Sequence, residues 1–384
     1  MVKVLEYKNI LIIKMSSLGD ILHTLPFAAA LRQRYPESKI SWLVHPQFAG
    51  FVPDPPLIDE VIYFDKSAFT KMSWIERVNF AKTFRRELHA KKFDLVIDLQ
   101  GLFKSAVVAF LTGTKDKIGY CQMREGSGFI SKPICGEHYG DHVIERYLDV
   151  ARYLGARVNG INFPMPDLKT ETAKVHTLLE ESGMKFLRKQ KNLQGKIVCG
   201  SVQDKLSFPV FNNQEPLEPY PYVVLVPGAR WETKKWPPEY FAKLAGMFIA
   251  DGLYVVLAGS KEDERQGEVI KDLANSPREI INLAGRTSLR ELAALIKECR
   301  FYVSGDTGPL HIAAALHKPL VAIYGPTRPD RTGPYGNKEA TVLVAPVECA
   351  GCLKKQCNNW FCMHKVTPEM VYQTYKNKMG ARHG

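Results

Sequence analysis

The chain has 384 residues, 45% of them hydrophobic, and this length exceeds the usual size of one hydrophobic core, so two domains are expected. The apolar stretches are far shorter than the roughly 18–20 residues that span a bilayer. The N-terminus lacks the pattern of a secretory signal, which predicts a cytoplasmic protein. A formal net charge of +12 favours a polyanionic partner but does not choose among nucleic acid, anionic lipid and acidic glycan.

Short apolar runs alternate with helical patterns through the first part of the chain. Such alternation predicts parallel βαβ units and a doubly wound α/β sheet. The helix expected over residues 73–91 carries many lysines and arginines, which indicates either a solvated basic face or a face that also meets an anionic membrane. The strands are expected at residues 10–14, 39–44, 60–64 and 93–98, and the other helix at residues 20–34.

The alternation breaks between about residues 185 and 221, a segment that we interpret as a linker or insertion. The predicted domains cover residues 1–200 and 222–365, joined by a linker over 201–221 and followed by a last helix within 366–384. In the second domain, strands are expected at residues 222–226, 253–258, 280–283, 301–304 and 320–324, and helices at 237–251, 263–274 and 289–298.

Two glycine-containing loops stand out, one in each half of the chain. Residues 16–20 read SSLGD, and residues 305–311 read GDTGPLH. Each follows an expected strand and leads into an expected helix, so each places free backbone N–H groups at a helix N-terminus, where anions are favoured. The pair suggests two nucleotide-fold lobes that share one cleft, with a phosphorylated ligand on one side and a second substrate on the other.

Asp20 in the first loop has two interpretations. A short carboxylate at the start of a helix commonly caps the free N–H groups of the first turn. If the carboxylate instead faces a cleft, it can serve as a general base toward the hydroxyl of an acceptor. The direction in which the side chain points decides between these roles.

The second loop combines Asp306 with Thr307, Gly308 and Pro309, followed by a helix of small residues. Small residues let such a helix approach the sheet closely and present its N-terminal amides to a diphosphate. An Asp-Thr-Gly sequence also occurs in aspartic proteases. That fold is all-β, so the α/β alternation argues against it.

Two more strand-to-helix loops carry polar residues. Residues 227–237 contain Lys234 and Lys235. A lysine beside a phosphate stabilises a departing nucleoside diphosphate, whereas a lysine pair taken alone is more often a solvated surface feature. Residues 259–262 lie at the end of the next strand, where the base or ribose of a nucleotide lies in such sheets.

Half of the eight cysteines are clustered near the C-terminus, and their spacing is compatible with a tetrahedral thiolate site. The spacing leaves three alternatives for this cluster: structural zinc, metal-free thiols, and disulfides or another centre. Its members are Cys349, Cys352, Cys357 and Cys362. The remaining cysteines are expected to behave as inert small hydrophobic residues; these are Cys121, Cys135, Cys199 and Cys299.

Together these motifs resemble the family 9 glycosyltransferases, the ADP-heptose:lipopolysaccharide heptosyltransferases. The resemblance covers most of residues 8–345, and its order and spacing are most similar to heptosyltransferase I. It is carried by residues 17–20 (SLGD), 23–26 (HTLP), 98–105 (DLQGLFKS), 234–237 (KKWP) and 306–314 (DTGPLHIAA).

The resemblance implies a GT-B fold, with two Rossmann-like domains facing across a cleft and a C-terminal helix that returns to the first domain. It also implies inverting, metal-independent transfer of L-glycero-D-manno-heptose from its ADP donor to the Kdo of a lipid A precursor. Such a protein is expected at the inner face of the cytoplasmic membrane, with no nucleic acid partner. It needs no cofactor for catalysis, and structural zinc is the one metal under consideration.

The resemblance also implies roles for individual residues, with Asp20 as the general base and Lys234 as the diphosphate-binding lysine. The residues expected on the donor side are Arg230, Ser260, Lys261, Glu262, Asp306, Thr307, Gly308 and His311. Those expected on the acceptor side are Ser17, Gly19, Gln100, Gly101, Lys104, Arg124 and Arg146. Arginine suits an acidic acceptor because its planar fork binds carboxylates bidentately.

The sequence departs from the family pattern in three places. Arg230 and the preceding alanine stand where small hydroxyl or acidic residues are expected, and the segment 185–221 is longer than an interdomain connection needs. The third is the cysteine cluster, to which the resemblance assigns no role. Two alternative functions remain: a transferase of the same fold with another donor or acceptor, and a non-catalytic basic protein that uses the cysteines as a zinc module for nucleic acid.

Overall fold

The structure, a computed structural model, describes residues 6–191, 197–201 and 217–380. The chain divides into two compact units, which comprise Met1–Asp167 with Asp330–Gly336, and Leu168–Pro329 with Asn337–Gly384. The division therefore lies at residue 167 and not at residue 200, and a short segment from the C-terminal half belongs to the first unit. None of the described helices is long and apolar enough to cross a membrane.

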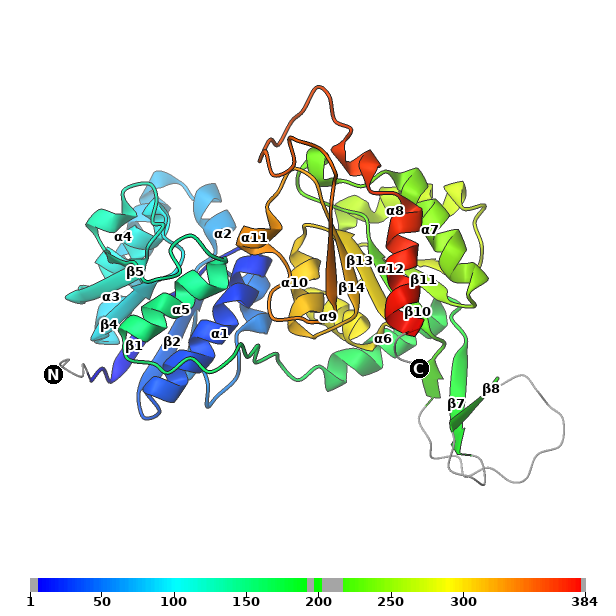
Figure 1. The fold of residues 1–384 in the computed structure, drawn as a ribbon. Coiled ribbons are helices and arrows are strands. Elements are labelled where there is room, and N and C mark those ends of the chain that lie inside the picture. The colour runs from blue at the N-terminus through cyan, green and yellow to red at the C-terminus, as the bar shows by residue number, and fades with distance from the viewer. Residues whose placement is uncertain (1–5, 192–196, 202–216, 381–384) are drawn as a thin grey trace. The chain divides into compact units, whose positions relative to one another are not determined.

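The first unit is built on a six-stranded parallel sheet (Figure 1). Its strand order is β3-β2-β1-β4-β5-β6, so β1 lies beside β4 and the topological switch point falls between them. The strands at the centre of the sheet are buried, as expected when helices cover both faces. The strands are β1 (Asn9–Ile13), β2 (Lys39–Val44), β3 (Glu60–Tyr63), β4 (Leu95–Asp98), β5 (Asp116–Tyr120) and β6 (Lys132–Ile134).

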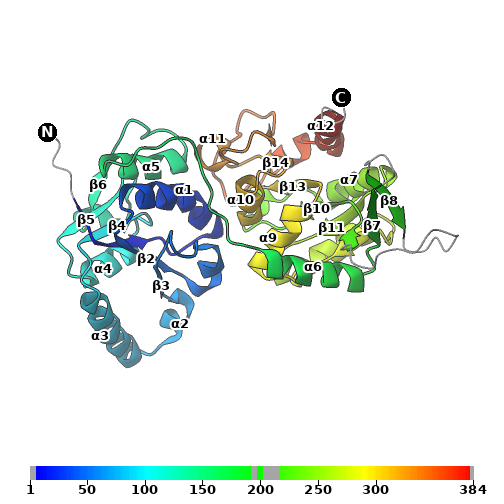
Figure 2. The ribbon, with the colours of Figure 1, turned by 90° about the horizontal axis from the view of Figure 1, so that it is seen from below.

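Helices cover both faces of this sheet, with α1 and α5 on one side and α3 and α4 on the other (Figure 2). Leu11 and Ile13 of β1 pack in the core with Phe84 of α3 and Val108 of α4. The helices are α1 (Leu18–Arg34), α2 (Lys66–Lys71), α3 (Trp74–Ala90), α4 (Phe103–Leu111) and α5 (Val143–Tyr153), with 3-10 turns η1 (Pro46–Phe51) and η2 (Ser127–Phe129).

The second unit repeats this topology with the strand order β12-β11-β10-β13-β14-β15, and its switch point lies between β10 and β13. The doubly wound α/β class predicted from the sequence is therefore confirmed in both units. The strands are β10 (Tyr222–Val226), β11 (Tyr254–Leu257), β12 (Ile280–Asn282), β13 (Phe301–Gly305), β14 (Leu320–Tyr324) and β15 (Ala340–Val344).

The last helix, α12 (Pro368–Gly380), packs on α7 (Pro238–Ala250) within the second unit. Its Tyr375 contacts Phe248 in a hydrophobic core that also contains Trp236. The apolar side of this helix is therefore covered by its own unit, and its return to the first domain stays a prediction. The remaining helical segments are η3 (Glu232–Lys234), η4 (Lys261–Asp263), α8 (Glu264–Leu273), α9 (Leu289–Glu298), α10 (Gly308–Ala315), α11 (Pro329–Thr332) and η5 (Cys362–Lys365).

The expected linker region does not connect the two units. Within residues 185–221, β7 (Phe186–Lys191) pairs in antiparallel fashion with β8 (Ile197–Ser201) and β9 (Leu217–Pro219). Most of the predicted linker, residues 202–216, lies outside the described residues. The chain first passes between the units at the end of residues 156–168, which form no helix or strand before α6 (Lys169–Glu181), and it crosses again on either side of residues 330–336.

Candidate active site

Asp20 lies in the first turn of α1, directly after β1. The backbone N–H and the hydroxyl of Ser17 both donate to its Oδ2 at 2.9 Å, so Ser17 is the N-cap and Asp20 closes a capping box from the third helical position with one carboxylate oxygen. The other oxygen, Oδ1, lies 3.5 Å from Nζ of Lys14. The Lys14 side chain is 2% exposed and that of Asp20 is 38% exposed, so the carboxylate remains open to solvent and to a ligand.

The surroundings of Asp20 keep it charged. Burial favours the neutral acid, but Lys14 and the hydrogen bonds from Ser17 outweigh it and hold the pKa of Asp20 below its ordinary value. Lys14 is itself fixed by the carbonyl of Leu99 at 2.8 Å and the hydroxyl of Tyr147 at 2.6 Å. The result is an anchored carboxylate that can accept a proton.

The turn after β4 lies next to this loop because β4 pairs with β1. The side-chain oxygen of Gln100 accepts hydrogen bonds from the backbone N–H groups of Met15 and Ser16, at 3.0 and 3.1 Å. Asp98, which is buried, shapes the turn by accepting from the N–H of Gly101 at 2.9 Å, and Gly101 has a φ of +63° that favours glycine. Gln100 therefore holds the backbone that leads to Asp20.

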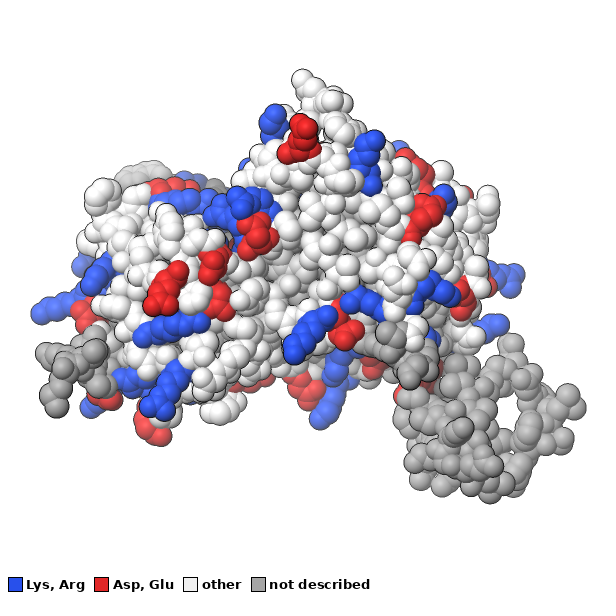
Figure 3. All heavy atoms as spheres, in the orientation of Figure 1, with Lys and Arg blue, Asp and Glu red and all other residues white. Residues whose placement is uncertain are grey.

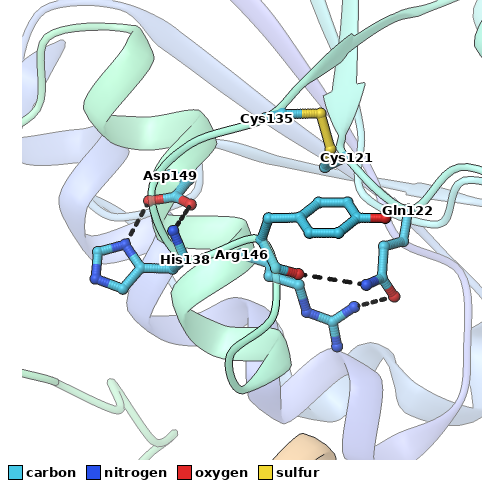
Figure 4. Close-up of a disulfide and its surroundings, with 7 residues drawn as sticks. Cys121, Gln122, Cys135, His138, Arg146 and Asp149 are labelled. Atoms are coloured by element: carbon cyan, nitrogen blue, oxygen red, sulfur yellow. Dashed lines mark hydrogen bonds and ion pairs between the residues drawn. A yellow bond between two sulfur atoms is a disulfide. The ribbon is translucent and has the colours of Figure 1, made fainter.

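Two arginines form a second feature of the first unit, Arg146 on α5 and Arg331 on α11. The guanidinium of Arg146 donates to Oε1 of Gln122 (Figure 4), and Nη2 of Arg331 donates to the same oxygen at 2.9 Å. Arg146 is buried, and its Nε has no hydrogen-bond partner. In the described part of the chain, neither arginine pairs with a carboxylate. Buried charges are normally paired, so this arrangement fits an anionic ligand.

The pKa of Arg146 reflects the same arrangement. Burial lowers the pKa of this guanidinium, and the nearby charge of Arg331 lowers it further. Both causes disfavour the cation. An anion bound between the two guanidinium groups would remove the repulsion between them.

The segment that carries Gln122 is closed by a disulfide between Cys121 and Cys135 (Figure 4). The expectation that these cysteines are inert thiols is wrong. They directly follow β5 and β6, which are paired neighbours in the sheet, so their Cα atoms lie 4.7 Å apart. Cys299 agrees with the expectation, because it is a buried free thiol whose pKa burial raises to about 12. The side chain of Cys199 lies outside the described part.

The other acceptor-side candidates are dispersed along the same unit. Gly19 is buried in the first turn of α1, and the backbone N–H of Arg124 donates to the carbonyl of Gly101 at 2.8 Å. Lys104 is exposed on α4, where the adjacent Lys66 lowers its pKa. Among the described residues, no hydrogen bond or ion pair joins Lys104 or Arg124 to Asp20.

A polar pocket of about 530 Å³ lies between α5 and the 330–336 segment within the first unit. The ring of Tyr335 stacks on His142 at 4.4 Å, and its hydroxyl donates to Glu145 at 3.0 Å. The lining contains more carboxylates than arginines, so it suits an anion less well than Arg146 and Arg331 do. Its residues are His138, Gly140, Asp141, His142, Glu145, Arg152, Asp330 and Tyr335.

Lys234 and Asp306 meet at the switch point of the second sheet. Nζ of Lys234 lies 2.6 Å from Oδ2 of Asp306 and 4.4 Å from the centre of the Trp231 ring. Gly305 permits this approach, because a Cβ at that position would lie 3.0 Å from the backbone oxygen of Lys234. The interpretation of the two lysines as a solvated surface feature holds only for Lys235, which pairs with the exposed Glu232.

The Asp306 turn leads directly into α10, whose N-cap is Thr307 and whose first residue is Gly308. The first N–H groups of a helix have no partners within the helix, so this end favours a phosphate. His311 is buried in the same helix. The structure thus brings four of the predicted donor residues to one helix end, beside Lys234.

The other donor candidates lie apart from this centre. Ser260, Lys261 and Glu262 are exposed at the end of β11, where Asp263 accepts from the N–H and the hydroxyl of Ser260 at 2.8 Å each. Arg230 is exposed in the loop after β10. Within the described ranges, no hydrogen bond or ion pair connects any of these residues to Lys234.

The four clustered cysteines are free thiols, so the disulfide alternative is wrong for this cluster. Burial raises the pKa of Cys362, and the other three cysteines add to this shift. In the described ranges, no group of three or more His, Cys, Asp or Glu side chains is arranged to hold a metal. The thiols of Cys349, Cys352 and Cys357 are exposed, and that of Cys362 is half-buried.

The loop that carries these cysteines supports the lysine site. Thr233, next to Lys234, donates its hydroxyl to the carbonyl of Lys354 at 2.8 Å. The backbone carbonyl of Thr233 accepts from the indole N–H of Trp360 at 3.1 Å. The cysteine loop is therefore hydrogen-bonded to both the side chain and the backbone of the threonine that precedes Lys234.

Zinc at Cys349, Cys352, Cys357 and Cys362 stays a prediction from the cysteine spacing, and it would require the four thiols to converge from the arrangement described above. The zinc alternative predicts about one zinc per chain in elemental analysis of the purified protein, a content that Cys352→Ser would abolish, whereas the arrangement of the described thiols favours the metal-free alternative. A protein without zinc, whose cysteines react rapidly with a thiol reagent, would contradict this prediction.

Residues 81–361 match a family described as glycosyltransferase family 9 (heptosyltransferase). The chain belongs to glycosyltransferase family 9. Over 360 residues it is 29% identical to lipopolysaccharide heptosyltransferase 1 of Pseudomonas aeruginosa, covering 91% of this chain and 87% of the relative. It is 30% identical to lipooligosaccharide heptosyltransferase 2 of Haemophilus ducreyi over 356 residues, covering 87% of this chain and 88% of the relative.

The fold comparison agrees with this family 9 assignment. A heptosyltransferase of Escherichia coli, solved with ADP-2-deoxy-2-fluoro heptose, superimposes with a TM-score of 0.65 and 25% identity, covering 96% of this chain and 99% of the other. The two Rossmann-like units are those of a GT-B glycosyltransferase. Relatives of types 1 and 2 match to nearly the same extent, so the family 9 assignment does not separate these types.

Proposed function

We propose that this chain is an inverting heptosyltransferase that moves heptose from ADP-L-glycero-D-manno-heptose to the Kdo region of the lipopolysaccharide inner core. The observation that supports this most is that one unit carries an anchored carboxylate, Asp20, and the other carries a lysine beside a helix N-terminus, Lys234. Each lies at the switch point of its own Rossmann-like sheet.

The proposed reaction is a single displacement without a metal. Asp20 takes the proton from an acceptor hydroxyl, whose oxygen forms a bond to the anomeric carbon of the donor. The bond from that carbon to the diphosphate breaks on the opposite side, so the configuration inverts. Lys234 and the first amides of α10 stabilise the charge that develops on the departing ADP. The hydroxyl proton is left on Asp20.

The arginine pair provides a binding site for the acid groups of the acceptor. We propose that a Kdo carboxylate binds between Arg146 and Arg331, because each guanidinium has donors left after its bond to Gln122. Arg331→Ala is expected to raise the acceptor KM roughly tenfold or more. The KM for the donor should stay near that of the wild type. Arg286→Ala, which removes an arginine bonded to Ser182 in the second unit, is the matched control.

The pKa of Asp20 predicts how activity depends on pH. Transfer requires the charged carboxylate. Because the pKa of Asp20 is lowered, the carboxylate stays charged at pH values where an ordinary aspartic acid would already be protonated. Lys14→Met removes the positive charge that does most to lower the pKa of Asp20 against the effect of burial, so that pKa should rise. The acid limb of the kcat/KM profile should then move to higher pH. An unshifted acid limb in a folded variant would show that Asp20 does not titrate in it.

The function is tested by incubating the protein with a panel of nucleotide sugars and Kdo-lipid A. Only ADP-heptose is expected to release its nucleotide, and only when the acceptor is present. Release from another donor, or only with an acceptor that already carries heptose, would favour the alternative of a family member with different substrates. The family assignment leaves the nucleic-acid alternative without support.

A further inference from the structure

The α4 helix carries apolar side chains on its outer surface as well as its inner one. Val108 and Ala109 pack into the core of the first unit. Phe103, Val107 and Phe110 are spaced by four and then three residues, so they share one side of the helix. Phe103 is 61% exposed and Phe110 64%. A helix that is apolar all round normally has a partner on each face.

A further aromatic side chain is exposed on the turn that packs against α4. The turn η2 packs against α4, and its Phe129 is 95% exposed. The N–H of Phe103 donates to the Glu125 carboxylate at 3.2 Å, which ties the start of α4 to the segment before η2. We call Phe103, Val107, Phe110 and Phe129 the α4 patch. Single exposed apolar residues are normal, whereas several exposed apolar side chains on one helix and on the turn packed against it mark an interaction surface.

Cations accompany the α4 patch. Lys104 follows Phe103 on α4 and lies beside Lys66, and Arg124 is exposed in the segment that leads to η2. Glu125 is the carboxylate near Lys104, so the local balance is positive. On the face of the molecule seen in Figure 3, by comparison, lysines and arginines are interspersed with acidic residues.

We propose that the α4 patch inserts into the surface of an anionic phospholipid membrane. Aromatic side chains bordered by lysine and arginine suit the boundary between head groups and acyl chains, where each nearby cation also attracts lipid phosphate. A second copy of this chain fits less well, because a symmetric contact would bring Lys66, Lys104 and Arg124 against the same cations.

The position of the α4 patch agrees with the proposed function, on which this part of the inference rests. The α4 helix begins two residues after Gly101, and Gln100 is bonded to the backbone that leads to Asp20. A lipid-linked acceptor whose acyl chains stay in the bilayer would have its sugars near this end of the sheet. The patch would thus bring the general base to the membrane surface.

The expectation that the helix at residues 73–91 meets the membrane receives less support. Arg77 of α3 donates to the backbone carbonyls of Phe69 and Thr70, and Lys91 pairs with Glu60. These two cations are therefore committed to contacts within the protein, whereas Lys82, Arg85 and Arg86 are exposed on the same helix. The apolar residues most exposed on α3, Trp74 and Ile75, lie only at its first turn.

The proposal is tested by sedimenting the full-length protein with phosphatidylcholine vesicles that contain or lack phosphatidylglycerol. The wild type should bind the anionic vesicles, and Phe110→Ser with Phe129→Ser should weaken binding by roughly tenfold for each phenylalanine removed. Both residues are exposed, so the variant should fold. Val269→Ser with Leu273→Ser, which changes exposed apolar residues of α8, is the matched control and should bind like the wild type.

This binding assay contains no donor or acceptor, so its result does not depend on the proposed reaction. Unchanged vesicle binding by the phenylalanine variant, or an equal loss in the α8 control, would overturn the proposal. So would a wild type that does not bind vesicles but forms a dimer that the phenylalanine variant loses. If the proposed function also holds, the variant should keep its turnover on a delipidated acceptor and lose efficiency only on an acceptor embedded in vesicles.

Discussion

Asp20→Ala is expected to reduce the rate of heptose transfer by roughly 10²–10⁴-fold, the usual contribution of a positioned general base. The variant should still bind ADP with nearly the wild-type Kd, because the diphosphate is proposed to lie at Lys234 and α10 in the other unit. Single-turnover transfer and calorimetric titration of ADP measure the two quantities separately. Near-normal turnover in the alanine variant would remove Asp20 from the mechanism.

A control is needed because Asp20 also accepts hydrogen bonds at the start of α1. Losing such a cap costs about 0.5–2 kcal/mol of stability. Glu291 provides the comparison, since it accepts the N–H of Ser288 at 2.8 Å at the start of α9 and has no proposed catalytic role. Glu291→Ala should lower the thermal midpoint to a similar extent without slowing transfer.

Lys234→Ala is expected to slow transfer by roughly 10²–10³-fold, the scale found when one donor to a developing anion is removed. Unlike Asp20→Ala, it should also weaken ADP binding, because the lost ammonium would contact the diphosphate in both the ground state and the transition state. The carboxylate of Asp306 would then lose its cation and repel the ligand. Calorimetry with ADP and steady-state kinetics test both effects.

Lys235→Ala is the matched control for this variant. Lys235 is adjacent in the sequence, but its ammonium pairs at 2.6 Å with the exposed Glu232. Ion pairs of this kind contribute little. If the two alanine variants lost transfer rate and ADP affinity equally, the site would recognise general positive charge and not the specific position of Lys234.

The sequence predicted most of the fold because strand and helix patterns are local. Apolar runs such as Val223 to Val226 fill strands that are buried on both faces, and the glycine loops after β1 and β13 lie where parallel sheets bind ligands. The domain division was misplaced because the break in the pattern at residue 185 is a small sheet added to the second unit, and the true connection is short and featureless.

Candidate site residues could be predicted only where a motif carries its own chemistry. Asp20, Lys234 and Asp306 were predicted in this way, and their roles stay predictions. Lys14 had a weak signal, a lysine that ends an otherwise apolar strand. Arg331 had none, because it joins the first unit from the C-terminal half of the chain through tertiary structure.

The disulfide between Cys121 and Cys135 was missed for a similar reason. The two cysteines become neighbours only once β5 and β6 are paired in the sheet. Gln122 likewise becomes significant only when α5 and α11 bring both arginines to its side-chain oxygen. Contacts of this kind depend on the order of the strands, which local patterns do not specify.

The most direct test of the account is a crystal structure of the protein with ADP. We expect the diphosphate to lie against the Gly305–Ala315 segment, within hydrogen-bond distance of Nζ of Lys234 and of the first amides of α10. Nucleotide bound instead at the end of β1 or β4 in the first unit, with Lys234 still closed on Asp306, would contradict the assignment of donor and acceptor to the two units.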